Sequence, residues 1–305
     1  MITSPVSITT ILNFPQIFFL LKYIYRLQQE EGLGVAVYVQ RDCNPPSDRD
    51  SYVKELMKYL PIDSYGPCLN NKQIPKNIDG FAKLSSHSYY QFLGKYKFQI
   101  AFENSLCRDY MTEKVFRPLY IGSVPVYFGS DAAQDFMPTN HSIIMVEDFE
   151  SPKHLAQYLL ELNKNDALYD EYLRHKKTKK IENHKLKEIL KRQPWKLPHI
   201  NHKYNFGSFM FSGFSCYVCD SVHERNNQLS EHLNDKKQQI MKPKIAHFSH
   251  MGCPIPVRTL KSSDGYPKQK AYQHGKKVAK ALSLMLLTNE TDSKTFQTKY
   301  LLNIS

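Results

Sequence analysis

The sequence lacks the signatures that would assign its positive charge to a nucleic acid. Its 305 residues hold 41 Lys and Arg against 29 Asp and Glu, a formal net charge of +12, which suits nucleic acid, a phosphate-bearing substrate or an acidic membrane surface. No zinc-finger or RNP pattern occurs, and the most basic stretch, residues 174–192, has no interleaved aromatic side chains to stack bases. We expect that stretch to be a solvated helix and loop, and nucleic-acid binding is the least favoured function.

The N-terminus lacks charge, yet it is a poor membrane span. The first 21 residues carry no charged side chain, and residues 11–21 are largely apolar. Asn13 and Pro15 interrupt the apolar run, and no basic segment precedes it, as a signal anchor would require. Residues 1–34 are therefore expected to be a leader, for which a buried or ill-fitting segment is preferred over a hydrophobic anchor.

The middle of the chain shows the alternation typical of βαβ units. Short β-branched runs alternate with helical patterns from Gly34 onward, which predicts a parallel sheet. Strands are expected at 35–40, 98–102, 124–128 and 143–146, and helices at 51–60, at 112–121 and after the N-cap Ser151. Together they predict one doubly wound α/β domain over residues 35–195. Residues 196–305, rich in Cys, His and Lys, are expected to be partly irregular with a helix at 276–287.

The densest group of functional side chains runs from Phe102 to Lys114. This segment leads from the end of an expected strand through a loop into the start of a helix. In open α/β sheets, ligands bind outside the carboxyl ends of the strands, and the N–H groups of helix N-termini attract anions. The segment therefore predicts a site for a diphosphate.

The same segment resembles the signature of glycosyltransferase family 10, the α-1,3-fucosyltransferases. That signature reads approximately Tyr-Lys-Phe, Phe-Glu-Asn-Ser, Asp-Tyr and Thr-Glu-Lys. At the same spacing, the chain has Tyr96-Lys97-Phe98, Phe102 to Ser105, Asp109-Tyr110 and Thr112-Glu113-Lys114. The resemblance extends over about residues 35–220 and implies a GT-B fold. This chain would supply mainly the C-terminal Rossmann-like donor-binding domain, with the N-terminal acceptor domain largely missing.

The resemblance implies a fucosyltransferase. Fucose would move from GDP-fucose, with inversion, to a hydroxyl of a glycan, α-1,3 to N-acetylglucosamine, or of a glycoprotein. The alternative is an inactive GDP-fucose-binding fragment. No metal or other obligate cofactor is expected, so cationic side chains must hold the leaving diphosphate. Family members imply a lumenal location in the Golgi or endoplasmic reticulum, as type II membrane proteins with an N-terminal anchor.

Five residues are the candidate donor site. Arg49 and Lys114 are assigned to the diphosphate, because both would offer positive charge to it. Glu113 is assigned to ribose or fucose hydroxyls and to the oxocarbenium character of the transferred sugar, and Tyr110 and Asn104 are assigned to further donor contacts. No matched position supplies the general base that the reaction needs. Taken alone, a Glu-Lys pair at a helix start is a capping arrangement, and only the family spacing favours a functional role.

The six cysteines permit disulfides or a mixture of thiols and metal ligands. Cys216 and Cys219, with Cys253 and nearby histidines, suggest a zinc knuckle, but their spacing fits no regular zinc pattern. The family resemblance favours disulfides, with partners unassigned. Three Asn-X-Ser/Thr triplets, at Asn140, Asn289 and Asn303, would accept glycans if the chain enters the secretory pathway.

Overall fold

The structure is a computed structural model. It describes residues 30–78, 86–108, 110–192, 218–230, 253, 267–288, 292 and 295. Most of the expected leader and much of the expected C-terminal tail lie outside these residues.

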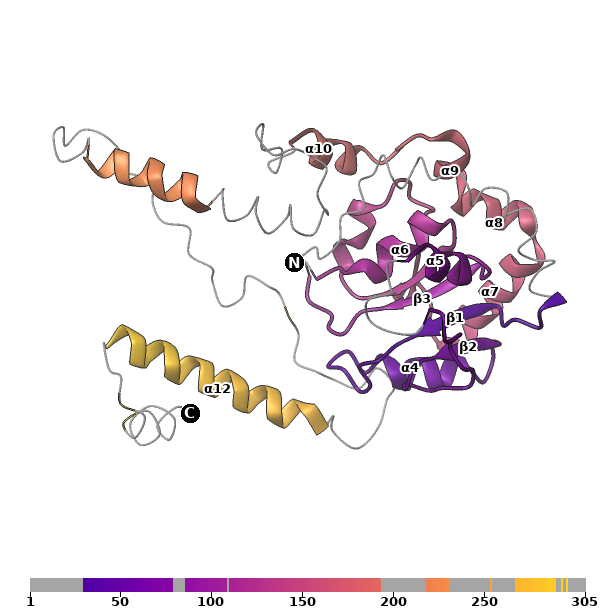
Figure 1. Ribbon diagram of the computed structural model, residues 1–305, viewed down its shortest axis with the longest axis horizontal. Helices are drawn as coiled ribbons and strands as arrows, with labels where there is room; N and C mark the ends of the chain where they lie inside the picture. Colours follow the sequence, from indigo (N-terminus) through magenta and orange to yellow (C-terminus); the bar gives the residue numbers. More distant parts are fainter. Residues whose placement is uncertain are drawn as a thin grey trace.

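A five-stranded parallel sheet forms the centre of the fold, in the order β2-β1-β3-β4-β5 (Figure 1). Its strands are β1 (Ala36–Val39), β2 (Ile62–Tyr65), β3 (Phe98–Phe102), β4 (Val124–Phe128) and β5 (Ile144–Met145). The predicted α/β fold with a parallel sheet is confirmed. Only β2 lies where no strand was expected, because its sequence Ile-Asp-Ser-Tyr is not a β-branched run.

Helices cover both faces of this sheet. They include α4 (Arg49–Leu56), α5 (His87–Leu93), α6 (Glu113–Ile121), α7 (Pro152–Lys164) and α8 (Asp166–Tyr172). Neighbouring side chains of a strand point to opposite faces, and along β3 Phe98, Ile100 and Phe102 share one buried cluster with residues of α4 and α7. Ala101 belongs to a second cluster with residues of α6. This two-sided burial confirms the doubly wound arrangement.

The helix ends follow the signals in the sequence. Thr112 is the N-cap of α6, and its hydroxyl accepts from the Lys114 amide at 3.4 Å. Gly122 ends the helix in the left-handed region, at φ 97°, as expected for a C-terminal glycine. The Ser151 hydroxyl caps α7 by accepting from the His154 amide at 3.2 Å. Thr112 and the predicted N-cap Ser151 thus fix where α6 and α7 begin.

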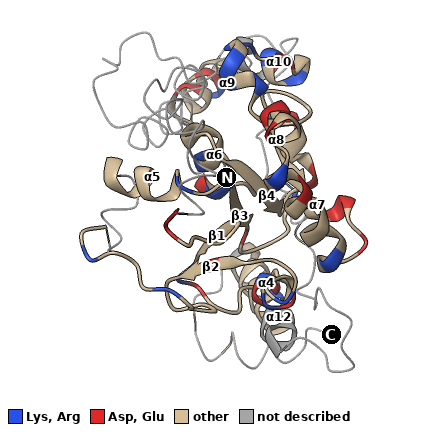
Figure 2. Cartoon of the chain, turned by 90° about the vertical axis from the view of Figure 1, so that its right-hand side faces the viewer, with Lys and Arg blue, Asp and Glu red and all other residues tan. Residues whose placement is uncertain are grey.

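The basic stretch forms α9 (Arg174–Thr178) and α10 (His184–Arg192), whose ribbons at one end of the domain are blue at the Lys and Arg positions in Figure 2. The expectation of a fully solvated stretch is wrong for two residues. His175 and Lys176 are buried, and the Lys176 ammonium donates to the Tyr120 carbonyl oxygen at 2.8 Å. Burial lowers the pKa of Lys176 to about 7. The Lys176 side chain therefore joins α9 to the C-terminal end of α6.

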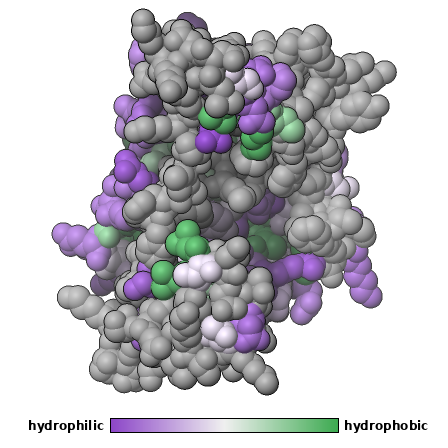
Figure 3. All heavy atoms as spheres, turned by 90° about the vertical axis from the view of Figure 1, so that its left-hand side faces the viewer, coloured by the Kyte–Doolittle hydropathy of each residue, from purple (hydrophilic) through white to green (hydrophobic). Residues whose placement is uncertain are grey.

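Beyond the α/β layers, residues 218–230 and α12 (Pro267–Leu287) are helical (Figure 1). The helix expected at 276–287 is thus confirmed and begins earlier. The face in Figure 3 shows small groups of hydrophobic atoms beside hydrophilic ones. Among the described residues, no helix combines the length and the apolar character that crossing a membrane requires.

Candidate functional site

A cavity of about 880 Å³ opens beside the carboxyl ends of β1 and β3. Strand β1 pairs with β2 on one side and with β3 on the other, so the chain changes direction here, and ligands of open α/β sheets bind at such a point. The volume lies within the range of about 300–1,000 Å³ common for small-molecule sites. Its lining combines residues 39–42, residues of the 66–74 segment, Tyr89, Asn104 and the first turns of α6.

The buried carboxylate of Asp50 fixes the conformation of the loop after β1. Asp50 accepts from the Tyr38 hydroxyl and from the Asn44 amide, both at 2.7 Å. Asn44 and Asp48 have φ values of 56° and 52°, a left-handed conformation that Asn and Asp adopt more readily than most residues. These contacts fix the turn between β1 and α4.

A disulfide ties this loop to the opposite wall of the cavity. Cys43 is bonded to Cys68, which follows β2, and the Cα atoms are 5.3 Å apart. Gly66 lies beside it at φ 89°, and a Cβ atom there would stand 2.4 Å from the Gln40 carbonyl oxygen. The two walls therefore approach so closely that only glycine fits at position 66.

Arg49 lies behind the cavity and does not line it. The side chain is fully buried, and its guanidinium donates to the Phe102 carbonyl oxygen at 3.0 Å and to the Asp42 carbonyl oxygen at 2.8 Å. It also donates to Oδ1 of Asn104, whose own amide donates to an Asp42 carboxylate oxygen at 3.2 Å. Arg49 thus joins the ends of β1 and β3 and orients Asn104, which does line the cavity. Its assignment to the diphosphate stays a prediction.

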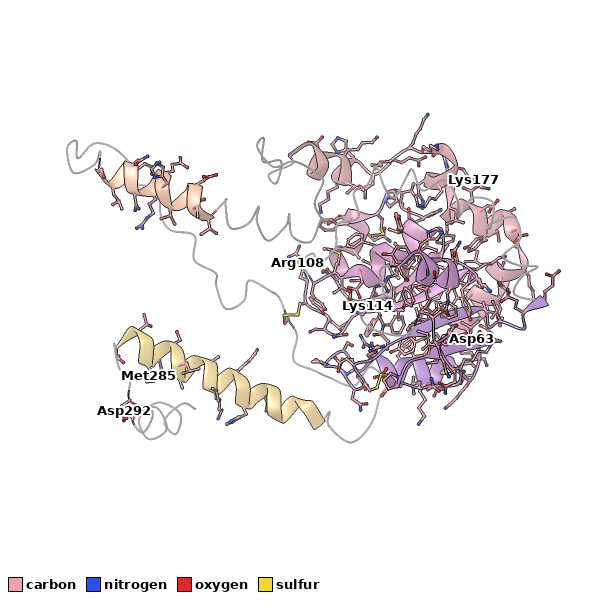
Figure 4. The ribbon with its side chains drawn as sticks, in the orientation of Figure 1. Asp63, Arg108, Lys114, Lys177, Met285 and Asp292 are labelled. Carbon is pink, nitrogen blue, oxygen red and sulfur yellow. A yellow bond between two sulfur atoms is a disulfide. The ribbon has the colours of Figure 1, made fainter. Side chains whose placement is uncertain are left out.

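Lys114 lines the cavity and is held at its floor by Glu103 and Thr112. Its ammonium donates to the Thr112 hydroxyl oxygen at 3.0 Å and lies 3.4 Å from Oε2 of Glu103. Glu103 is fully buried and accepts from the Thr112 amide at 2.7 Å and from the Thr112 hydroxyl at 2.8 Å. In Figure 4, Lys114 of α6 lies within the domain, whereas Arg108, in the loop before α6, projects from the edge of the domain.

Two effects act on the pKa of Glu103 in opposite directions. Burial raises the pKa of Glu103, and the nearby Lys114 ammonium lowers it. The lysine therefore supplies the positive charge that a buried carboxylate requires. Lys114 also lines the cavity, and 15% of its side chain is exposed.

Two further arginines line the cavity. Arg117 lies one turn beyond Glu113 on α6, with 3.7 Å between a guanidinium nitrogen and a Glu113 carboxylate oxygen, and it stands 5.5 Å from the centre of the Tyr89 ring. Arg41 follows β1 and is exposed. Sequence reasoning missed both as site residues, although Arg117 follows the Thr-Glu-Lys motif by three positions and Arg41 directly follows the expected strand at 35–40.

Of the five predicted site residues, the structure brings three together on the cavity wall: Asn104, Glu113 and Lys114. Tyr110 is half-buried outside the lining, and burial raises its pKa. Glu103 was quoted in the motif without a role. Its position directly after a buried strand was the only available signal, because its burial depends on the fold.

Lys97, in the Tyr-Lys-Phe part of the motif, stabilises the fold and lies away from the cavity. Lys97 is buried, with its ammonium donating to the Asn163 carbonyl oxygen at 2.9 Å and to an Asp166 carboxylate oxygen at 2.6 Å. It also lies 4.9 Å from the centre of the Tyr169 ring. Lys97 precedes β3, at the end of the sheet opposite the cavity. It therefore joins the sheet to α7 and α8.

The cysteines are used in disulfides where the structure describes a pair. Besides Cys43–Cys68, Cys107 is bonded to Cys253 (Figure 4). This bond excludes the zinc-knuckle alternative in which Cys253 was a ligand. Cys219 is exposed.

A parallel α/β sheet with a cation-lined cavity at its switch point is the construction of nucleotide-binding α/β domains. The profile described as Glycosyltransferase family 10 (fucosyltransferase) C-term matches residues 28–238. The chain belongs to glycosyltransferase family 10.

Similar proteins carry a more specific name. A Danio rerio protein named GDP-fucose protein O-fucosyltransferase 3 is 40% identical over 275 residues, which cover 88% of this chain and 58% of the relative. The Rattus norvegicus protein of the same name is 37% identical over 287 residues, covering 90% of this chain and 57% of that one. The chain thus spans somewhat more than half the length of these relatives. A solved α1,3-fucosyltransferase with GDP is 27% identical with a TM-score of 0.40, covering 52% of this chain and 45% of that chain.

Proposed function

We propose that this chain forms the GDP-fucose-binding part of a fucosyltransferase that modifies protein hydroxyls. The observation that carries the proposal is the cavity at the switch point, where Asn104, Glu113 and Lys114 of the family motif meet. The family membership and the names of the relatives support the donor and the class of acceptor.

The diphosphate of the donor binds at the start of α6. Lys114 offers its ammonium there, and Arg41 and Arg117 add two guanidinium groups around the same cavity. The first turn of α6 lines the same cavity, and helix N-termini favour anions. As the bond to fucose breaks, negative charge grows on the leaving diphosphate, and cations fixed in advance stabilise that charge without reorganising.

Glu113 and Asn104 contact the hydroxyls of the donor. The Glu113 side chain is 43% exposed, and its carboxylate accepts from ribose or fucose hydroxyls and stabilises the positive charge that develops at the anomeric carbon. Asn104 has its amide oriented by Arg49 and Asp42. The general base that takes the acceptor proton is not assigned to a residue of this chain.

The acceptor is a hydroxyl on a protein. The α-1,3 linkage to N-acetylglucosamine, expected from the family resemblance, is the competing assignment. The same proposal includes a lumenal location in the Golgi or endoplasmic reticulum, and the two disulfides support it because such bonds persist in oxidising compartments.

Calorimetric titration of the purified chain with GDP, GMP and GDP-fucose tests the donor site. We expect GDP and GDP-fucose to bind and GMP, which lacks the second phosphate, to bind much more weakly. Equal affinity for GDP and GMP would remove the diphosphate assignment, and no GDP binding by folded protein would overturn the proposal. Salt-dependent binding of RNA with indifference to GDP would instead support the basic-surface alternative.

Incubation with GDP-fucose and two acceptor classes tests the transfer step. A panel of folded secreted domains presents protein hydroxyls, and a panel of glycans ending in N-acetylglucosamine presents the competing acceptor. Fucose on a protein hydroxyl supports the proposal, and fucose on the glycan alone replaces it with the α-1,3 assignment. Donor binding without transfer to either panel favours the inactive fragment.

A further inference from the structure

The turn before β5 presents an exposed asparagine within an acceptor triplet for N-linked glycans. Asn140 precedes His141 and Ser142, and it lies between η2 (Asp131–Phe136) and β5. Asn140 is exposed, whereas Ser142 is only 1% exposed. Within the described part of the chain, no hydrogen bond engages the Asn140 side-chain amide. Its nitrogen is therefore on the surface and uncommitted.

Thr139 and Ser142 fix this turn. The Ser142 hydroxyl oxygen accepts from the Thr139 amide at 2.9 Å and lies 2.7 Å from the Thr139 hydroxyl oxygen. The His141 amide donates to the Thr139 hydroxyl oxygen at 3.3 Å. These bonds leave Asn140 at the tip of the turn.

We propose that Asn140 carries an N-linked glycan, a modification that rests on the lumenal location proposed above. The glycan donor is an oligosaccharide linked through its reducing N-acetylglucosamine to a lipid diphosphate. A bond forms between the Asn140 amide nitrogen and the anomeric carbon, while the bond from that carbon to the lipid diphosphate breaks. The lipid diphosphate leaves with the electron pair, and the nitrogen gives up one proton to the transferase.

The modification precedes folding of this turn. Glycan transfer requires the hydroxyl of the third residue of the triplet, and in the folded protein the Ser142 hydroxyl is buried and bonded to Thr139. A folded chain is therefore a poor substrate, while a nascent chain presents the whole triplet. This order distinguishes the site from one modified on the native surface.

The folded surface has room for the sugars. Two hollows, of about 270 Å³ and 570 Å³, are both lined by Asn140 and His141. The His141 ring stacks on Tyr172 with 6.1 Å between ring centres, and the Tyr172 hydroxyl lies 2.5 Å from that of Tyr158. Aromatic faces of this kind suit the apolar faces of pyranose rings. The first N-acetylglucosamine residues thus lie over these hollows without displacing packed side chains.

This site is separate from the donor cavity. Asn140 comes before a parallel strand, whereas the cavity lies beyond the carboxyl ends of β1 and β3, and the linings of the two hollows share no residue with it. A glycan on Asn140 therefore leaves GDP access unchanged.

The test uses the full chain directed into the secretory pathway of a eukaryotic cell by an added signal peptide. Chain recovered from the lumenal or secreted fraction is digested, and the peptide containing Asn140 is analysed by mass spectrometry with and without peptide N-glycosidase. We expect a glycan on Asn140, released as aspartate. Unmodified Asn140 in lumenal chain overturns the proposal.

Matched variants test whether the detected glycan is attached to Asn140. Asn140→Gln should lose the glycan at this site, Ser142→Thr should keep it, and Asn289→Gln should leave it unchanged. GDP affinity should be equal in Asn140→Gln and the parent chain. Efficient glycosylation of refolded, unmodified chain by purified transferase would refute the stated order of events.

Discussion

Lys114→Met removes a lysine that lines the proposed donor cavity and also faces the buried Glu103. A hydrogen bond to a charged group contributes roughly 1.5–3 kcal/mol, and 1.4 kcal/mol corresponds to a tenfold change in affinity. We therefore expect GDP to bind roughly 10- to 150-fold more weakly. Methionine keeps most of the volume of the side chain, so the cavity wall stays filled.

The same change should make stability depend more strongly on pH. The pKa of Glu103 is raised by burial and lowered by Lys114, so removal of the ammonium raises the folded-state pKa further. A raised folded pKa gives stability that is present below the unfolded pKa and is lost as the pH rises through the folded pKa. Between about pH 5 and about pH 7.5, the variant should therefore lose stability relative to the parent, by at most about 1.4 kcal/mol per pH unit.

Calorimetric titration with GDP and thermal melting at the two pH values measure both effects. Lys153→Met is the matched control, because Lys153 is the second residue of α7 as Lys114 is the second residue of α6, and it is exposed and outside the cavity. The control should change neither quantity. If folded Lys114→Met binds GDP as tightly as Lys153→Met does, the assignment of Lys114 to the diphosphate is wrong.

Three other substitutions test the frame around the cavity. Arg49→Met should lower the free energy of unfolding by roughly 1.5–3 kcal/mol in chemical denaturation, because it removes the charged donor of three hydrogen bonds, one of which goes to the buried Phe102 carbonyl oxygen. A stable variant with weakened GDP binding would favour a direct phosphate contact. Gly66→Ala should cost roughly 1–3 kcal/mol, measured the same way, because of its φ of 89° and the contact with Gln40. Replacing Cys43 and Cys68 by serine should lower stability by about 3.5 kcal/mol for a sequence separation of 25 residues, and unchanged melting would contradict this.

Much of the fold follows from local signals. Strands β3 and β4 were predicted at their observed bounds because both are short runs of mostly apolar residues, and the caps of α6 and α7 follow from Thr112, Gly122 and Ser151. Strand β2 was missed because Asp63 interrupts its hydrophobic pattern. In the structure that carboxylate accepts from the Gly34 amide at 2.9 Å and from the Tyr96 hydroxyl at 2.8 Å, partners that are distant in the sequence.

The site was predictable only where the motif itself lines the cavity. Asn104, Glu113 and Lys114 meet there because a strand end and a helix start are adjacent in the fold. Arg41 follows a different strand, β1, and only the pairing of β1 with β3 brings it near. Conversely, Arg49 was assigned to the diphosphate because of its charge. In the fold, its guanidinium donates to two backbone carbonyl oxygens.

The spacing of the motif reflects the requirements of the fold as well as those of a ligand. Glu103 directly follows β3, and its carboxylate binds the amide of Thr112, where α6 begins. That contact sets the position of the helix start relative to the strand end, and hence the position of Lys114 in the cavity. Loss of Glu103 should therefore displace the lysine even though the carboxylate itself is buried away from any ligand. The motif therefore includes residues that fold the loop, such as Glu103, as well as residues that line the cavity, such as Lys114. Only the residues that line the cavity are available to contact the proposed nucleotide sugar.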